Sequence, residues 1–161
     1  MFIAIAAAVL TAIFVIRAAA KADPFRVRRS TCIDAPPEKI RELIDDFTRW
    51  ASWSPYEDLD PVMRRAYSEP AAGAGAVYAW KSSGRAGTGK MVITESSPSR
   101  VVVQLERAKT HAVAEFRLRA VSGATEVTWS IDGMGSIVEK LMLGRDFETG
   151  LANLKALVER N

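Results

Sequence analysis

The chain has 161 residues, of which 48% are hydrophobic and 25% charged, enough for one domain with a real core. Positive charge is concentrated near the start: residues 17–30 hold five basic side chains and one acidic, whereas residues 31–161 hold 17 basic and 18 acidic. Because the body of the chain carries no net positive charge to attract phosphates, its composition argues against nucleic-acid binding.

The first segment is strongly apolar. Residues 1–16 contain no charge, and their single polar side chain is Thr11. A bilayer is spanned by about 20 apolar residues, so residues 1–20 are expected to form a transmembrane anchor in which Arg17 extends its guanidinium toward the headgroups. Such an anchor would bind the protein to a membrane through its N-terminal helix.

The charges that flank this segment predict an orientation. Basic residues next to a span stay on the cytoplasmic side, so a basic linker, residues 21–24, and a domain, residues 25–161, should face the cytoplasm from the inner membrane. The alternative is a secreted or periplasmic protein, because residues 20–22 read Ala-Lys-Ala, like a signal cleavage site. The basic start of a secretory signal is missing, which favours the anchor.

One cysteine and one histidine limit the available chemistry. Cys32 has no partner for an intramolecular disulfide or a zinc site, so no metal and no cofactor are expected. It is interpreted as a small, buried residue of the first strand. His111 would have to serve alone in a Ser-His-Asp or Cys-His centre, so it is interpreted as a strand residue and no catalytic residue is assigned.

The domain is expected to begin with a strand over residues 25–33, followed by a helix. Asp34 suits the cap of that helix, and two prolines at 36–37 suit its first turn. The helix should end near Asp46, before a second short helix over residues 47–52. Its apolar stripe comprises Ile40, Leu43, Ile44 and Phe47.

Two features follow these helices. Trp50 and Trp53 lie three residues apart, and they are expected either to gate the mouth of a cavity or to brace the helices on a sheet. Glu57, Asp58 and Asp60 crowd into what is interpreted as a solvated turn.

The apolar period then changes to two, with polar residues on the alternate positions, which is typical of antiparallel strands with one wet face. Short turns between the segments predict successive hairpins. The expected strands cover residues 62–68, 76–81, 89–94, 101–105, 112–118 and 127–131.

A last helix closes the chain, with an apolar stripe formed by Phe147, Leu151, Leu154 and Val158. Gly144 and Gly150 lie beside this stripe and cost about 1 kcal/mol each in helix propensity relative to Ala. Two explanations stay open: the glycines let the helix approach the sheet closely, or they leave space for a ligand.

Several segments in this order resemble a known superfamily. They read I-D-A-P-P-E-K-I, F-T-R-W-A-S-W-S-P-Y, G-A-G-A-V-Y-A-W, G-T-G-K-M-V-I-T-E-S-S-P-S-R-V-V and D-F-E-T-G-L-A-N-L-K. Their succession over about residues 25–160 is similar to that of the START-like, Bet v 1-like (SRPBCC) superfamily of polyketide cyclase/dehydratase-related proteins. The resemblance implies an α+β helix-grip fold: a curved seven-stranded antiparallel sheet around a long C-terminal helix, with two short helices after the first strand.

The resemblance also implies a hydrophobic cavity between the sheet and the final helix. The Tyr78 hydroxyl and the indole N–H groups of Trp80 and Trp129 would be its polar groups, unless all these side chains simply fill the core. The candidate ligand-binding residues are Tyr78, Trp80, Met91, Ile93, Phe116, Trp129 and Phe147.

Three functions remain. The favoured one is a membrane-tethered protein that binds a hydrophobic small molecule, lipid-like or aromatic, in the cavity. The second is an enzyme of the polyketide cyclase or dehydratase type, which requires a titratable group such as His111 or Tyr78 in the cavity. The third is a packed interaction module without a ligand.

Overall fold

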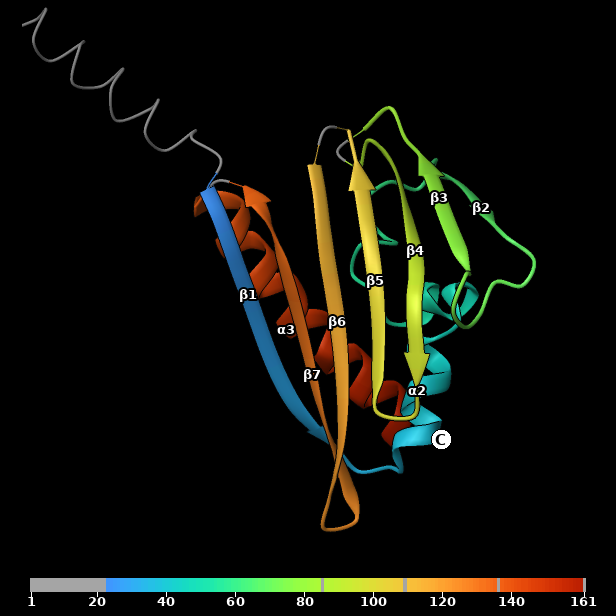
Figure 1. The fold of residues 1–161 in the computed structure, drawn as a ribbon, viewed down its shortest axis with the longest axis vertical. Coiled ribbons are helices and arrows are strands. Elements are labelled where there is room, and N and C mark those ends of the chain that lie inside the picture. Colours follow the sequence, from blue (N-terminus) through green and yellow to red (C-terminus); the bar gives the residue numbers. More distant parts are fainter. Residues whose placement is uncertain (1–22, 85, 109, 136, 161) are drawn as a thin grey trace, which may run out of the picture.

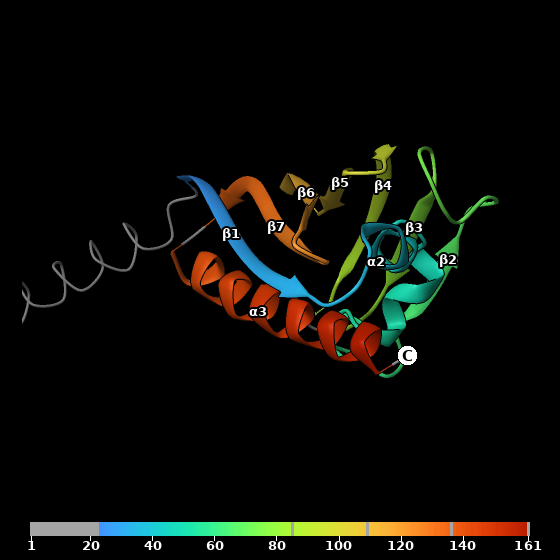
Figure 2. The ribbon, with the colours of Figure 1, turned by 90° about the horizontal axis from the view of Figure 1, so that it is seen from below.

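The computed structural model describes residues 23–84, 86–108, 110–135 and 137–160. Seven antiparallel strands form one curved sheet in the order β1-β7-β6-β5-β4-β3-β2, and a long helix, α3, lies along one face of it (Figures 1 and 2). This arrangement confirms the expected α+β helix-grip fold. The elements are β1 Asp23–Ile33, α2 Pro37–Ile44, the 3-10 helix η1 Phe47–Ser52, β2 Arg64–Tyr67, β3 Val77–Lys81, β4 Thr88–Ser97, β5 Arg100–Arg107, β6 Thr110–Val121, β7 Ala124–Gly135 and α3 Ile137–Glu159.

Strands β2 to β7 form the expected series of hairpins, and β1 pairs with β7 along its whole length, from Asp23 opposite Gly135 to Ile33 opposite Thr125. The two short helices, α2 and η1, precede the hairpins in the chain (Figure 1). This topology brings the first strand and the last helix together, and α3 packs mainly against β1 (Figure 2).

The start of α2 differs from the expectation. Pro36 is its N-cap, and the expected cap, Asp34, lies further back in the chain, where its backbone N–H donates to Glu159 (2.9 Å). The prolines fix this start, because a helix accepts Pro in its first turn and the residue before a Pro favours extended backbone. The second short helix, η1, is confirmed, and its N-cap Asp46 accepts from the backbone N–H of Thr48 (2.9 Å).

The two tryptophans of this region brace the helices. Trp50 and Trp53 are 3% and 1% exposed, and their indole N–H groups donate to the backbone carbonyls of Ile44 (2.9 Å) and Leu43 (3.0 Å). Both hydrogen bonds fasten η1 and the residue after it to the last turn of α2. The structure therefore supports bracing for both residues, and Trp50 also lines the cavity described below.

The glycines of α3 serve close packing. A Cβ atom on Gly150 would lie 2.8 Å from the Trp129 ring and 3.1 Å from Pro55, and one on Gly144 would lie 2.6 Å from the Arg29 guanidinium. Real Cβ atoms essentially never come within 3.0 Å of a neighbour. Position 150 therefore needs glycine for the approach to the Trp129 ring, whereas at position 144 the neighbour is the far end of a flexible side chain, which can move.

Two residues singled out for their chemistry lie on the outside. Cys32 belongs to β1, as expected, but it is exposed rather than buried. Successive strand residues point to opposite faces, and its neighbour Ile33 takes the inner face with 0% exposure. His111 is exposed on β6, and it is not among the residues that line the cavity described below.

Within the described ranges no helix is long and apolar enough to cross a membrane, and the expected span, residues 1–20, lies outside them.

Candidate ligand-binding cavity

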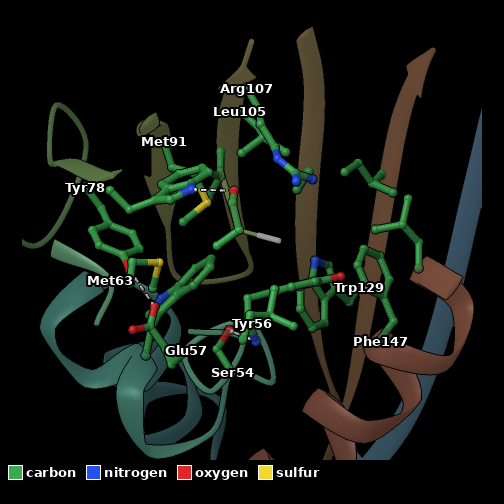
Figure 3. Close-up of a pocket in the computed structure, with 18 residues that line it drawn as sticks. Ser54, Tyr56, Glu57, Met63, Tyr78, Met91, Leu105, Arg107, Trp129 and Phe147 are labelled. Atoms are coloured by element: carbon green, nitrogen blue, oxygen red, sulfur yellow. Dashed lines mark hydrogen bonds between the residues drawn. The ribbon is translucent and has the colours of Figure 1, made fainter. Parts of the chain in front are cut away.

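A cavity of about 160 Å³ lies between the sheet, the N-terminal half of α3 and the segment that follows η1 (Figure 3). Most of its lining side chains are apolar or aromatic. Leu59 and Arg107 line it and are also exposed to solvent, so they mark its open side.

Five of the seven residues selected from the sequence meet at this cavity: Tyr78, Trp80, Met91, Trp129 and Phe147. The other two, Ile93 and Phe116, are 0% exposed and are not among the lining residues. They point to the inner face of the sheet, as the period-two pattern predicts, but they lie in the packed core. Phe116 stacks behind Trp129, with ring centroids 4.9 Å apart.

Trp129 forms the centre of one wall. Its ring stacks on Phe147 of α3, with centroids 3.9 Å apart and an angle of 7° between the planes, while Phe116 covers the ring from β6. The glycine at position 150 lets this ring pack closely against α3. The wall is therefore rigid, because sheet, ring stack and helix fix one another.

The indole nitrogens of the four tryptophans differ in one respect. Those of Trp50 and Trp53 donate to backbone carbonyls, as described above, and that of Trp80 donates to the carbonyl of Ala86 (3.1 Å). The buried indole nitrogen of Trp129 has no hydrogen-bond partner among the residues that the structure describes. A buried donor left in this state costs about 1–3 kcal/mol.

A polar network closes one end of the cavity. Glu57 is 6% exposed; one of its carboxylate oxygens accepts from the Tyr78 hydroxyl (2.8 Å) and the other from Arg65 (2.6 Å). Arg65 also donates to the backbone carbonyl of Glu57 (2.7 Å). Burial, and secondly the hydrogen bond to Glu57, raise the pKa of Tyr78 well above its usual value, so its hydroxyl keeps its proton at neutral pH.

The interpretation of the acidic turn as solvated is wrong for two of its three members. Asp58 is exposed, but Glu57 and Asp60 are 6% and 8% exposed. Asp60 accepts from the Ser82 hydroxyl and from the backbone N–H of Val62 (3.0 Å). These hydrogen bonds lower the pKa of Asp60, and the one from Ser82 has the largest effect. The bond to Ser82 also joins this segment to the β3–β4 hairpin.

Among the lining residues that the sequence interpretation missed, three carry titratable side chains: Tyr56, Glu57 and Arg107. Burial, and then the charge of Asp146, raise the pKa of Tyr56. For Arg107 a signal exists, because it follows Leu105 by two residues in β5 and therefore shares its inner face. No local pattern marks Glu57, whose arginine partner comes eight residues later on another element.

The fold recurs in solved structures. A Chromobacterium violaceum protein is 17% identical, with a TM-score of 0.64 over 83% of this chain and 96% of that one. A Rhizobium leguminosarum protein is 12% identical, with a TM-score of 0.66 over 87% and 97%. DynU16, a protein of the dynemicin biosynthetic locus, is 18% identical, with a TM-score of 0.60 over 83% of this chain and 47% of that one.

At these identities the structural likeness establishes the fold alone. Among curated proteins none matches the sequence. The family model described as "Polyketide cyclase / dehydrase and lipid transport" matches residues 24–159, which is nearly the whole domain, and it confirms the superfamily resemblance. This chain therefore belongs to the polyketide cyclase / dehydrase and lipid transport family.

Proposed function

We propose that this protein binds a hydrophobic small molecule, lipid-like or aromatic, in the cavity between the sheet and α3. The observation that carries the proposal is the apolar cavity itself, which a rigid aromatic wall keeps open beside Trp129. An apolar cavity of about 150 Å³ admits benzene. A single ring or a short acyl segment therefore fits inside, and a longer ligand would extend past Leu59.

The proposal is tested by extracting small molecules from the purified full-length protein and identifying them by mass spectrometry. A stoichiometric apolar molecule is the expected result. An empty extract from a protein that also excludes added apolar probes would overturn the proposal and favour an interaction module without a ligand.

The proposal includes a tether formed by residues 1–20, which rests on the sequence pattern. Within the domain, the tether is supported by the position of the open side of the cavity. Asp23, where β1 begins, pairs with Gly135 at the end of β7, and Arg107 ends β5 at the same end of the sheet (Figure 1). The anchor would then join the domain at the end where the cavity opens.

A topology reporter tests the tether. Fused after Asn161, it should be active only in the cytoplasm. A mature protein that begins at Asp23 would instead establish cleavage and export.

The second candidate is an enzyme of the cyclase or dehydratase type, favoured by the hydrogen-bonded pair Tyr78 and Glu57 in the cavity. Binding is the better supported function, because both carboxylate oxygens of Glu57 are occupied and Tyr78 holds its proton tightly. Conversion of the extracted molecule by the wild-type protein, but not by Tyr78→Phe, would establish the enzyme.

A further inference from the structure

We propose that the ligand carries a carboxylate, which accepts a hydrogen bond from the indole N–H of Trp129 and pairs with the guanidinium of Arg107. This inference rests on the proposed function, since it names the class of molecule that the cavity binds. It assigns the apolar body of the ligand to the aromatic and methionine side of the cavity, near Met91.

The first observation is the contrast among the four indoles. Three donate to backbone carbonyls at 2.9 to 3.1 Å, whereas the Trp129 nitrogen, buried in the cavity wall, has no acceptor among the described residues. Buried donors in folded proteins are almost always paired. Trp129 itself is 3% exposed, so bulk water does not serve this donor, and a group inside the cavity is the natural acceptor.

The second observation is the charge of the lining. Among the described lining residues the charged ones are Glu57 and Arg107. Glu57 already accepts from Arg65 and Tyr78, so it does not require a cationic ligand. Arg107 reaches inward from the end of β5, above Trp129, whose nitrogen lies on the upper edge of its ring (Figure 3).

A carboxylate fits this pair of donors better than a neutral group does. It has two oxygens that only accept, so it can serve the indole and the guanidinium together, whereas an alcohol brings a proton that needs an acceptor of its own. A guanidinium has five N–H donors, so Arg107 retains donors for a ligand while it interacts with the protein. Hydrogen bonds to a charged acceptor are also about twice as strong as neutral ones.

The test compares two probes with the same carbon skeleton, 4-phenylbutyrate and 4-phenylbutan-1-ol, on the full chain in one detergent. Indole N–H resonances of ¹⁵N-labelled tryptophan are followed during each titration. The acid should move the Trp129 proton downfield, as a new hydrogen bond does, and should leave the Trp53 proton unchanged, because that donor is already engaged and Trp53 is not among the lining residues. This readout needs no variant.

Three variants sharpen the test. Trp129→Phe keeps a ring between Phe147 and Phe116 but removes the donor, and Arg107→Gln removes the cation. Each should weaken binding of the acid about tenfold, as loss of a charge-assisted hydrogen bond does, and should change binding of the alcohol by less than about twofold. Arg119→Gln, on an exposed arginine paired with Glu126, is the control and should change neither. For each probe, the ratio of the dissociation constants of two variants does not depend on how much of the probe partitions into the detergent, since that fraction is the same for both.

The outcomes separate this inference from the proposed function. If acid and alcohol bind equally, or if the variants weaken both alike, the carboxylate is overturned and a neutral apolar ligand remains. If neither probe binds, both proposals fail. An acid that binds while the Trp129 resonance stays in place would also overturn the inference.

Discussion

Gly150→Ala and Gly144→Ala should change stability in opposite directions, although both replace a glycine of α3 with the best helix former. In each case Ala contributes about 1 kcal/mol of helix propensity. The neighbours of the new methyl group decide the difference. At position 150 they are the Trp129 ring and Pro55, whereas at position 144 the neighbour is the end of the Arg29 side chain.

The magnitudes follow from these contacts. The Trp129 ring cannot yield, because it is stacked on Phe147 and Phe116, so overpacking costs about 1–3 kcal/mol and Gly150→Ala should destabilise by about 1 kcal/mol net. Arg29 can swing away at the cost of its exposed ion pair with Glu148, which is worth about 0–1 kcal/mol. Gly144→Ala should therefore stabilise by about 0.5 kcal/mol.

Urea unfolding of both variants and the wild type, followed by near-ultraviolet circular dichroism, measures these changes. A difference of about 1.5 kcal/mol separates the midpoints of the two variants by roughly 0.7 M, for a typical dependence of about 2 kcal/mol per M. If Gly150→Ala unfolds at the same urea concentration as Gly144→Ala or a higher one, the close packing of Trp129 against α3 does not determine the choice of glycine, and the rigid wall of the cavity is disproved.

Three further predictions concern the cavity and its border. Glu57→Gln should destabilise the folded protein by about 1–3 kcal/mol, because it removes the buried charge that pairs with Arg65. Glu126→Gln, in an exposed ion pair, should change the urea midpoint little. Equal effects of the two substitutions would refute the role of the buried network. Folding lowers the pKa of Asp60 from its ordinary value of 3.8. The ionised carboxylate therefore stabilises the folded state above pH 3.8, and this stabilisation is lost as the pH falls through the lowered pKa. The stability difference between the wild type and Asp60→Asn, measured by urea unfolding, should accordingly shrink from pH 6 to pH 3, and a constant difference would contradict this reasoning. Ala114→Leu places a larger side chain in the cavity lining and should reduce binding of 4-phenylbutan-1-ol in calorimetry, while Ala120→Leu, at an exposed position of the same strand, should not; equal binding by both would show that the probe lies elsewhere.

The strands and their inner faces could be predicted from the sequence, because side-chain direction alternates strictly along a strand. The same rule selected Ile93 and Phe116 together with the five residues that line the cavity. Alternation predicts which face of the sheet a side chain lies on, but it does not predict whether the side chain borders a cavity or is packed in the core. Whether an inward side chain borders the cavity depends on what covers it, and Phe116 is covered by Trp129, its partner on the adjacent strand.

The polar part of the site was harder to predict, because it depends on contacts between distant elements. Glu57 was interpreted as a surface residue from its acidic neighbours, yet its burial depends on Arg65 and on Tyr78 of β3. The indole donor of Trp129, which has no acceptor among the described residues, is likewise a property of the folded wall. By contrast, the positions of α2 and η1 could be predicted because prolines act on the residues next to them, although the expected cap, Asp34, was wrong.

The most direct test of the central claim, that the cavity holds an apolar ligand, is methyl NMR of the methionines during a titration with 4-phenylbutan-1-ol. Met63 and Met91 line the cavity, whereas Met134 and Met142 are exposed on the outside, 49% and 45% respectively, and serve as controls in the same molecule. The account predicts saturable shifts of the Met63 and Met91 methyl resonances with Met134 and Met142 unchanged. Shifts confined to Met134 and Met142, or no saturable shift at all, would contradict it.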